Sequence, residues 1–239
     1  MKTVPTGDSP GKREAVRGMF SEITPGYDRL NRLLSAGQDL RWRRKAVRLF
    51  SPEVQKVLDV AAGTGDLSLA LIRERPDVRI FATDFVRKMC EKGQSKLSGD
   101  KSLMAFAVAD ALKLPLHDQS FDACMAAFGV RNFENLGAGL QEMCRILRPG
   151  GEILVLEFFP SRNAFIEKIF RFYFQHILPR IGALVSGKSE AYRYLPRSVG
   201  DFVDRETFAE LLRKTGFVEI RNHEFSGGIA TAFHARRGG

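Results

Sequence analysis

Short apolar runs alternate with segments of helical periodicity along the chain from residue 57 onward. Short apolar runs are typical of strands, whereas apolar residues at every third or fourth position indicate amphipathic helices. The pattern predicts strands at Val57–Ala61, Arg79–Asp84, Leu103–Asp110, Phe121–Phe128 and Glu152–Phe158. It predicts helices at Leu67–Arg75, Val86–Leu97, Gly139–Leu147 and Arg205–Thr215, the third of them stopped by Pro149-Gly150-Gly151.

The alternation predicts an α/β fold. Strands that alternate with helices are joined by right-handed crossovers, which build a parallel sheet covered on both faces. The last two apolar runs, Phe217–Phe225 and Ile229–Ala235, flank Gly227-Gly228 and are expected to form a hairpin.

The flanking segments lie outside this alternation. Residues 1–14 contain two Pro and two Gly and are predicted to be a disordered tail. Residues 15–50 have a helical pattern with breaks at Pro25-Gly26 and Gly37. Residues 159–200 interrupt the alternation and are interpreted as a helical insertion. We therefore expect one domain over residues 15–239.

Composition narrows the class of protein. The 239 residues are 44% hydrophobic and 27% charged, as in ordinary globular proteins, which excludes collagen-like, coiled-coil and wholly disordered chains. No apolar stretch reaches the roughly 18 residues that a membrane span needs, and the N-terminus lacks a signal-peptide core. The three cysteines form no C-x-x-C pair and the histidines do not cluster, so we expect a reduced, cytoplasmic setting and no metal site.

The net charge of +9 is concentrated in two segments. Residues 1–50 carry 11 basic and 5 acidic side chains, and residues 158–198 carry 7 and 2. The second segment is also rich in phenylalanine. A basic, aromatic surface can meet anionic lipid, nucleic acid or an acidic ligand, although a solvated face beside a core helix explains it as well.

A Gly-rich turn follows the first predicted strand. Gly63 and Gly65 allow a tight turn and a close approach of a ligand to the backbone, and the next helix N-terminus favours a negative group such as a carboxylate. The dinucleotide fingerprint G-x-G-x-x-G is not fulfilled, because Ser68 stands at its sixth position. The turn alone is weak support for nucleotide binding.

Acidic residues strengthen that hypothesis, because they end three successive strands. Asp84 ends the second strand, where a carboxylate can accept hydrogen bonds from both ribose hydroxyls, although it could instead cap the next helix. Asp110-Ala111 ends the third strand, where an adenine edge could lie. Asp59, in the first strand, is expected to be buried and to need amide partners.

These features, with several longer motifs, resemble a known group. The order V-L-D-V-A-A-G-T-G-D, A-T-D-F, V-A-D-A, L-P, F-D and L-R-P-G-G is similar to class I S-adenosylmethionine-dependent methyltransferases. More narrowly, the chain resembles the menaquinone/ubiquinone-biosynthesis C-methyltransferase family, from about Phe20 to His234. The narrower match rests on Tyr27–Asn31, Phe128–Phe133, Leu156–Phe158, Leu178–Gly182 and Tyr192–Ser198.

The resemblance implies a Rossmann-like fold with a seven-stranded, mostly parallel sheet whose last strand is antiparallel, a helical N-terminal segment and a helical cap. It implies S-adenosylmethionine as co-substrate. The residues it places at this cofactor are Asp59, Gly63, Thr64, Gly65, Asp84, Phe85, Asp110 and Ala111, with the two glycines shaping the turn. The chain departs from many relatives at Ala62, Ala127 and Leu30, where Gly, Ser and Met are common.

The implied reaction is methyl transfer to a ring carbon of a reduced, hydroxylated quinone precursor. The quinol rather than the quinone is required, because its oxygen donates electron density to the attacking carbon, and a base or positioned water must then remove the ring hydrogen. Arg131 is the expected main catalytic residue, stabilising the developing oxyanion and orienting a water, with Asn132 and Tyr27 positioning the ring hydroxyl or that water. A surface ion pair is the structural alternative for Arg131.

The cap is expected to meet the substrate through Tyr192, Arg193 and Tyr194, with packing inside the insertion as the alternative. Trp42 could anchor the protein at a membrane interface or pack in a helix contact. Because both basic segments belong to the parts that would cover a membrane-borne polyprenyl quinol, we expect contact with anionic lipid.

Several alternatives stay open at this stage. The acceptor could be demethylmenaquinol, the benzoquinol precursor of ubiquinone, or a soluble aromatic compound. An RNA methyltransferase is disfavoured because no RNA-binding module is visible. A non-catalytic cofactor-binding scaffold and a nicotinamide-dependent oxidoreductase are the other classes. The sequence leaves open whether the protein is a homodimer.

Overall fold

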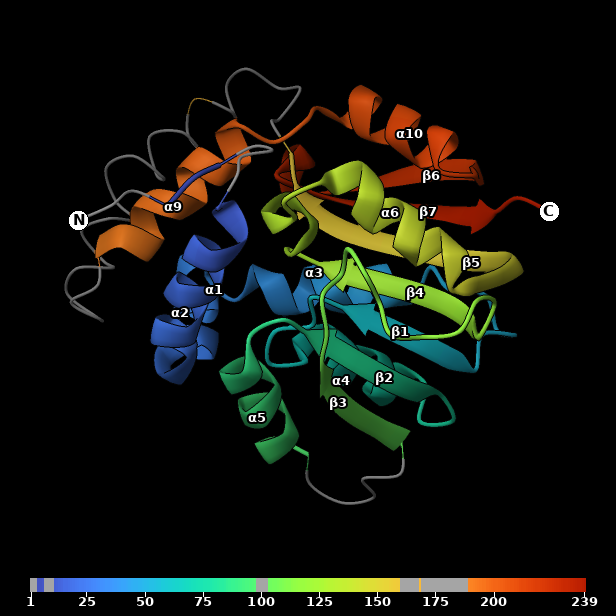
Figure 1. The fold of residues 1–239 in the computed structure, drawn as a ribbon, viewed down its shortest axis with the longest axis horizontal. Coiled ribbons are helices and arrows are strands. Elements are labelled where there is room, and N and C mark those ends of the chain that lie inside the picture. Colours follow the sequence, from blue (N-terminus) through green and yellow to red (C-terminus); the bar gives the residue numbers. More distant parts are fainter. Residues whose placement is uncertain (1–3, 7–10, 98–102, 160–167, 169–188) are drawn as a thin grey trace.

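A seven-stranded sheet forms the centre of the computed structural model, which describes residues 4–6, 11–97, 103–159, 168 and 189–239 (Figure 1). The strand order is β3-β2-β1-β4-β5-β7-β6. The strands are β1 (Lys56–Val60), β2 (Arg79–Asp84), β3 (Met104–Val108), β4 (Phe121–Ala127), β5 (Leu147–Phe158), β6 (Phe217–Phe225) and β7 (Ala230–Arg237).

The predicted topology is confirmed. Strands β1 to β5 pair in parallel, while β7 pairs antiparallel with both β5 and β6. The central strands β1 and β4 are buried over nearly their whole length, as expected for a sheet covered on both faces. The hairpin around Gly227-Gly228 is present, with a short 3₁₀ turn, η5 (Ser226–Gly228), between β6 and β7.

Two sets of helices cover the two faces of the sheet. Helices α3 (Gln38–Val47), α4 (Asp66–Glu74) and α5 (Arg87–Ser95) pack on one face, and α6 (Leu136–Arg145) and α10 (Arg205–Lys214) pack on the other. Each face has its own apolar core, one centred on Leu140 and Phe208 and the other on Ala46 and Leu71.

The helix boundary near residue 147 differs from the prediction. Helix α6 ends at Arg145, and Pro149-Gly150-Gly151 lies inside β5 instead of separating a helix from a strand. The pairing of β4 with β5 shifts register between Phe121 and Ala123, so the Pro-Gly-Gly segment forms an irregularity at the start of the strand. The turn-forming residues Pro149-Gly150-Gly151 therefore form a bulge within the strand and do not end it.

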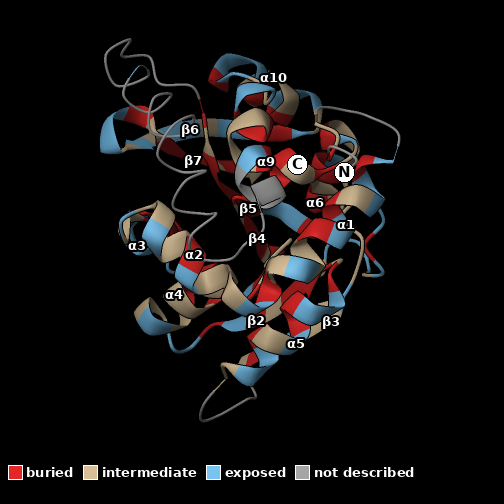
Figure 2. Cartoon of the chain, turned by 90° about the vertical axis from the view of Figure 1, so that its left-hand side faces the viewer, coloured by how far each residue is buried: buried red, intermediate tan, exposed pale blue. Residues whose placement is uncertain are grey.

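Helices from both ends of the chain gather beyond the carboxyl ends of the parallel strands (Figure 1). They are α1 (Lys12–Ile23), α2 (Tyr27–Leu34), which follows the short turn η1 (Thr24–Gly26), and α9 (Ser189–Gly200). Figure 2 looks onto this end, where α1 and α9 lie close together. Val16 and Met19 of α1 pack with Tyr194 of α9 in a third apolar cluster.

Residues 1–14 were predicted to be a disordered tail, but the last residues of this segment belong to a helix in the structure. Helix α1 begins at Lys12, whose side chain is only 2% exposed, and Val4 packs in the third apolar cluster. Residues 1–3 and 7–10 lie outside the described part. The segment is therefore ordered where it reaches the rest of the protein, because apolar and charged side chains there find buried partners.

Trp42 is a packing residue, so the membrane-anchor alternative for it is wrong. Its ring is 6% exposed and lies 6.0 Å from the ring of Phe158 and 6.3 Å from that of Phe128. Its Nε1 donates a hydrogen bond of 2.9 Å to Ser226 Oγ. A buried indole with its one donor satisfied has no group left for a membrane interface.

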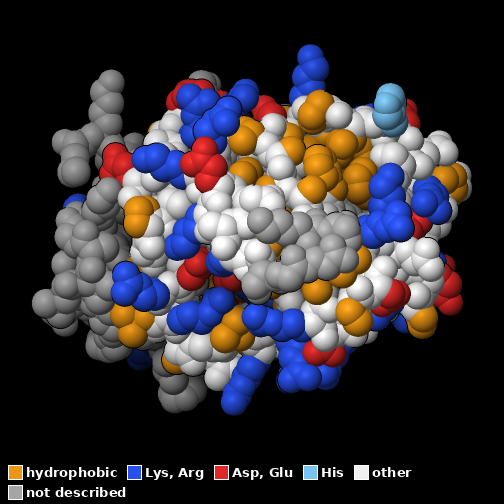
Figure 3. Space-filling model, turned by 90° about the horizontal axis from the view of Figure 1, so that it is seen from below, with side chains coloured by type: hydrophobic (Ala, Val, Ile, Leu, Met, Phe, Trp, Pro, Cys, Tyr) orange, Lys and Arg blue, Asp and Glu red, His pale blue; other side chains and the backbone are white. Residues whose placement is uncertain are grey.

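Most of the predicted insertion, residues 159–200, lies outside the described residues, which include only Phe159, Lys168 and α9 from it. Among the helices that the structure describes, none is both long and apolar enough to cross a membrane. On the lower face of the molecule, Lys and Arg side chains stand in several separate groups with Asp and Glu among them (Figure 3).

Gly151 tests the irregular start of β5. A Cβ built there would lie 2.9 Å from Arg148 O and 3.0 Å from Asp122 O, both backbone atoms that cannot move aside cheaply. We expect Gly151→Ala to lower the free energy of unfolding by about 1–3 kcal/mol, measured by urea denaturation. The matched control is Gly18→Ala, inside α1 with no atom within 4 Å of the new Cβ, which should raise stability by about 0.5–1 kcal/mol. Equal shifts for the two variants would contradict this account.

Candidate functional site

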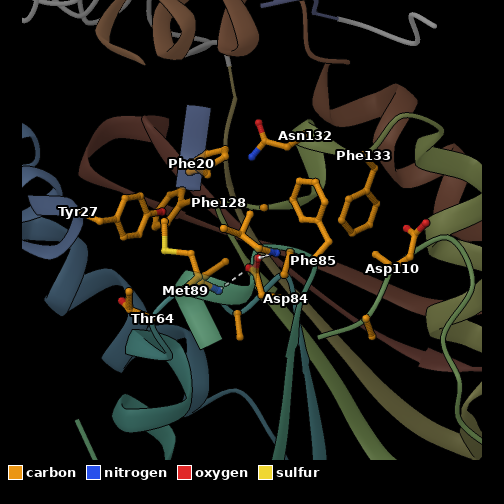
Figure 4. Close-up of a pocket in the computed structure, with 18 of the residues that line it drawn as sticks. Phe20, Tyr27, Thr64, Asp84, Phe85, Met89, Asp110, Phe128, Asn132 and Phe133 are labelled. Carbon is orange, nitrogen blue, oxygen red and sulfur yellow. Dashed lines mark hydrogen bonds between the residues drawn. The ribbon is translucent and has the colours of Figure 1, made fainter. Parts of the chain in front are cut away.

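A cavity that is partly open to solvent lies where the loops after β1, β2, β3 and β4 diverge (Figure 4). Within the sheet, β2 and β3 follow β1 in one direction, whereas β4 and β5 lie on the other side of β1, so the strand order reverses between β1 and β4. Open α/β sheets bind ligands at such a reversal of strand order. The wall residues from these loops and from α1, α2 and α3 include Phe20, Tyr27, Arg43, Gly63, Thr64, Asp84, Phe85, Asp110, Ala111, Phe128, Asn132 and Phe133.

The loops after β1 and β4 touch each other at the bottom of the reversal. Ala61 and Phe128 have φ values of 52° and 58°, in the left-handed region that residues with side chains rarely adopt. A Cβ on Gly129 would lie 2.8 Å from Ala61 Cβ, so only glycine fits there without a shift. Backbone conformations of this kind cost free energy and are concentrated at functional sites.

The Gly-rich turn has the predicted shape. Gly63 and Gly65 have φ values of 57° and 79°. Gly65 packs so closely on Phe106 that a Cβ would lie 2.6 Å from its ring, and it does not line the cavity. Gly63 does line it, beside Tyr27, so the first glycine faces the ligand space and the second closes the turn.

Asp84 links the first two loops. Its Oδ2 accepts a hydrogen bond from Gly63 N and its Oδ1 accepts one from Val86 N, each of 2.8 Å. The N-cap residue of α5 is Val86, so Asp84 is not itself the cap, although it does bind a backbone amide at that end. Burial raises the pKa of the Asp84 carboxyl from 3.8 to about 6, against the effect of the two amide donors.

Asp110 and Ala111 line the opposite end of the cavity, after β3. Asp110 Oδ1 accepts a hydrogen bond of 3.0 Å from Leu112 N, and its Oδ2 lies 3.1 Å from Arg13 Nη1 of α1. The ion pair connects the N-terminal helix to the third strand loop. In Figure 4 the rings of Phe85 and Phe133 stand between Asp84 and Asp110 and form an apolar wall.

Thr64 is buried and its hydroxyl is already engaged. It donates a hydrogen bond of 2.5 Å to Asp28 Oδ1 and accepts one of 2.9 Å from Lys96 Nζ. Lys96 also pairs with Asp28 and Asp66, and Lys92 pairs with Asp28. These bonds hold α2 against α4 and α5, and so fix the wall formed by Tyr27.

Asp59 lies behind the cavity and does not line it. It is fully buried, and its Oδ2 accepts a hydrogen bond of 2.6 Å from the hydroxyl of Ser68, while its Oδ1 has no partner. Burial raises the pKa of the Asp59 carboxyl to about 7. The predicted burial is confirmed, and the hydrogen bond that holds the carboxylate comes from a serine hydroxyl.

The expected catalytic residues fall into two groups. Tyr27 and Asn132 line the cavity, and the hydroxyl of Tyr194 donates a hydrogen bond of 2.9 Å to Asn132 Oδ1. Arg131, in the 3₁₀ turn η3 (Val130–Asn132), does not line it. Burial raises the pKa of the Tyr27 hydroxyl, and it raises that of Tyr194 to about 12.

Arg131 forms a buried ion pair, which excludes the surface-pair alternative. Its Nη1 donates to Glu157 Oε1 at 2.7 Å and to Phe128 O at 2.6 Å, and its Nε donates to Ser198 Oγ at 3.3 Å. Both partners of the pair are at least nine-tenths buried. Burial raises the pKa of Glu157 despite the neighbouring guanidinium.

Lys12 fixes the same turn from the N-terminal helix. Its Nζ donates hydrogen bonds of 3.0 Å to Arg131 O and 2.8 Å to Phe133 O. Nothing in the sequence marked this lysine, because a lysine at a helix start is usually solvated. Glu157 and Phe128 do belong to motifs that carry the family resemblance, and Arg43 directly follows Trp42 in the sequence. The local sequence does not indicate that these side chains are buried, because their burial depends on the tertiary fold.

The three expected substrate residues of α9 differ in position. Tyr194 is buried against α1 and reaches Asn132, so it packs inside the cap and also touches the cavity wall. Arg193 is exposed. The side chain of Tyr192 lies outside the described part.

The cavity suits a nucleoside that carries an amino-acid tail. It offers carboxylate acceptors at Asp84 and Asp110, aromatic walls at Phe85 and Phe133, and a cation at Arg43. Within the residues that the structure describes, no group of His, Cys, Asp and Glu could hold a metal ion.

A family model described as the ubiE/COQ5 methyltransferase family matches residues 9–237. The chain is 46% identical to "Demethylmenaquinone methyltransferase" from Deinococcus radiodurans, over 95% of this chain and 94% of the relative. It is 42% identical to "Ubiquinone/menaquinone biosynthesis C-methyltransferase UbiE" from Geobacter sulfurreducens, over 95% and 90%.

Solved structures share the fold at low sequence identity. The [4+2]-cyclase SpnF matches with a TM-score of 0.66 and 16% identity, over 100% of this chain and 99% of the other. Phosphoethanolamine N-methyltransferase 2 from Haemonchus contortus, in complex with S-adenosyl-L-methionine, matches with 0.60 and 14%, over 83% and 53%. These structures support the fold alone, since one fold hosts different chemistries.

The raised pKa of Asp84 predicts a pH dependence of nucleoside binding. Ribose hydroxyls are donors, so they bind the ionised carboxylate, and protonation below about pH 6 removes an acceptor. We expect the affinity for S-adenosylhomocysteine to fall by up to about tenfold per pH unit below pH 6, measured by calorimetry. Asp84→Asn should bind about 10–100-fold more weakly at pH 7.5 and lose this dependence.

The control for this titration is Asp59→Asn, because Asp59 also has a raised pKa but lies behind the cavity. This variant should keep the inflection near pH 6. An inflection that survives in Asp84→Asn would show that another group causes it.

Proposed function

The chain belongs to the ubiE/COQ5 methyltransferase family, and we propose that it methylates a ring carbon of a reduced polyprenyl quinone precursor, most readily demethylmenaquinol. It is an S-adenosylmethionine-dependent methyltransferase. The observation that carries the proposal is the extent of the family match, since residues 9–237 include the cavity, the turn of Arg131 and the cap. The high identity to a demethylmenaquinone methyltransferase supports the choice of acceptor.

The methyl donor, when bound, supplies a methyl group on a positively charged sulfur. Asp84 would accept hydrogen bonds from its ribose, Asp110 would meet its adenine, and the backbone at Gly63 would lie along it. Phe85 and Ala111 would enclose the base. Thr64 would act through its position in the turn, because Asp28 and Lys96 already occupy its hydroxyl.

We propose that Asn132 and Tyr27 orient the hydroxylated ring, since both line the cavity. Tyr194 supports this role, because its hydroxyl bond fixes the Asn132 amide. Arg131 would act from just behind Asn132, and its positive charge would favour the ring oxyanion that raises electron density at the attacking carbon. The ring proton would leave to a water that these groups position.

Glu157 has a positioning role in this proposal. It holds the Arg131 guanidinium at 2.7 Å and cannot itself reach the cavity, since it is fully buried. Arg193 and Tyr192 are proposed to meet the substrate from the cap, where only the backbone of Tyr192 is described.

A methyl-transfer assay with radiolabelled donor tests the function. Reduced demethylmenaquinone, the reduced benzoquinol precursor of ubiquinone and a tailless naphthoquinol are compared side by side, each with its oxidised form as control. We expect the first acceptor to give the highest kcat/KM and the oxidised forms to be inactive. Preference for the tailless naphthoquinol would favour a soluble aromatic acceptor. Binding of donor without transfer to any acceptor would favour the scaffold alternative.

Arg131→Ala is expected to lower transfer at least about 100-fold while the affinity for S-adenosylhomocysteine changes little. Removing one partner of a buried ion pair also destabilises a protein, here by about 3–5 kcal/mol, because Glu157 would lose its counter-charge. The double variant Arg131→Met/Glu157→Gln removes both charges and is expected to recover stability but not activity. Near-normal turnover in either variant would overturn the role given to Arg131.

We propose further that the protein works in the cytoplasm at the inner face of the cytoplasmic membrane. The polyprenyl acceptor is lipid-soluble, and the basic segments 1–50 and 158–198 both contribute to the end of the molecule where α1, α2 and α9 lie. The lower face, where charges of both signs mix, is a poorer candidate for lipid contact (Figure 3). Whether the protein forms a homodimer would be determined from its molar mass in solution, measured by light scattering.

Vesicle flotation tests the membrane proposal. We expect binding to vesicles containing anionic phospholipid, weakening as salt rises to physiological strength, and little binding to neutral vesicles. Binding that is indifferent to lipid charge would contradict the proposal and leave the transfer activity untouched.

A further inference from the structure

A buried arginine lines the cavity without a hydrogen-bond acceptor. Arg43 of α3 is 5% exposed, and its guanidinium carbon lies 5.0 Å from the centre of the Phe128 ring. Within the described part of the chain the guanidinium makes no hydrogen bond, and Nε is buried without a partner. Leaving the buried Nε–H donor of a guanidinium unused costs free energy. The site therefore lacks an acceptor.

The carboxylates near Arg43 are already bound to other cations. Asp39 Oδ2 lies 3.8 Å from Arg43 Nε, which is an ion pair but too long for a hydrogen bond, and Asp39 binds Arg32 directly. Asp66 accepts hydrogen bonds of 2.8 Å from Arg32 and from Lys96. Arg43 is thus held in place by Asp39 while its donors remain available on the cavity side.

The position of Arg43 along the sheet identifies which part of the ligand it meets. Asp110 follows β3, whereas Phe128, on which Arg43 stacks, follows β4, three strand spacings away, or about 14 Å. With the nucleoside held at Asp84 and Asp110, the amino-acid tail of the methyl donor points toward Arg43. We propose that Arg43 binds the α-carboxylate of that tail and selects ligands that carry it. The inference rests on the proposed function.

Calorimetry with two ligands isolates the carboxylate. S-adenosylhomocysteine has it, whereas its decarboxylated form, S-adenosyl-1-thio-3-aminopropane, keeps the nucleoside, sulfur and amine. The wild type is expected to bind the first at least about tenfold more tightly. Arg43→Met should weaken S-adenosylhomocysteine about 10–100-fold and change the affinity for the decarboxylated ligand less than about threefold.

The neighbouring Arg44→Met is the matched control, because it removes the same charge from the same helix at an exposed pair with Glu74. It should leave both affinities unchanged. Arg43→Lys, which keeps the charge without the planar fork, should retain part of the preference and provides the measurement if Arg43→Met does not fold. Equal weakening of both ligands, or no weakening of either, would overturn the proposal. Failure of the wild type to bind S-adenosylhomocysteine would instead contradict the assigned activity.

Discussion

The reversal of strand order between β1 and β4 is the constraint on which the site depends. Right-handed crossovers that leave this point in opposite directions must carry their helices on opposite faces, as α4 and α5 do on one side and α6 on the other. The two loops therefore diverge above the sheet and leave a crevice that no side chain of either face can fill. The two loops approach each other closely at its base, where Gly129 meets Ala61.

Buried carboxyl groups lie at the wall of the crevice and behind it, and burying a charge costs free energy unless the charge is compensated. Burial raises the pKa values of Asp59 and Asp84 to about 7 and about 6. Each carboxyl therefore contributes stability at pH values below its unfolded pKa, near 4, and this contribution is lost as pH rises toward the folded pKa. At neutral pH both groups destabilise the ligand-free protein, and ligand donors would offset that cost at Asp84, which lines the cavity. A buried carboxylate whose charge is incompletely compensated gains the most free energy when a ligand donates hydrogen bonds to it.

The N-terminal segment completes the site from outside the sheet. Lys12 holds the carbonyl groups of the turn that carries Arg131 and Asn132, and Arg13 pairs with Asp110 at the opposite end. Tyr194 joins this segment to Asn132 through α9. One helix thus contacts the region proposed for methyl transfer and the region proposed for the nucleoside, so its docking couples the geometry of the two.

The sequence by itself determined the alternation of elements, the sheet direction and the acidic strand ends, because apolar periodicity and turn residues act within a few positions of the chain. Asp84 could be named for the same reason, whereas Thr64 and Asn132 were implied by the resemblance of their local motifs to a known family. Only the tertiary structure decided that Pro149-Gly150-Gly151 lies in a bulge, that Trp42 is buried, and that Arg131 pairs with Glu157 behind the cavity wall. It also decided the roles of Lys12 and Arg43, whose partners are far away in sequence. A side chain's burial and its hydrogen-bond partners depend on what the fold brings beside it, and local sequence does not carry that information.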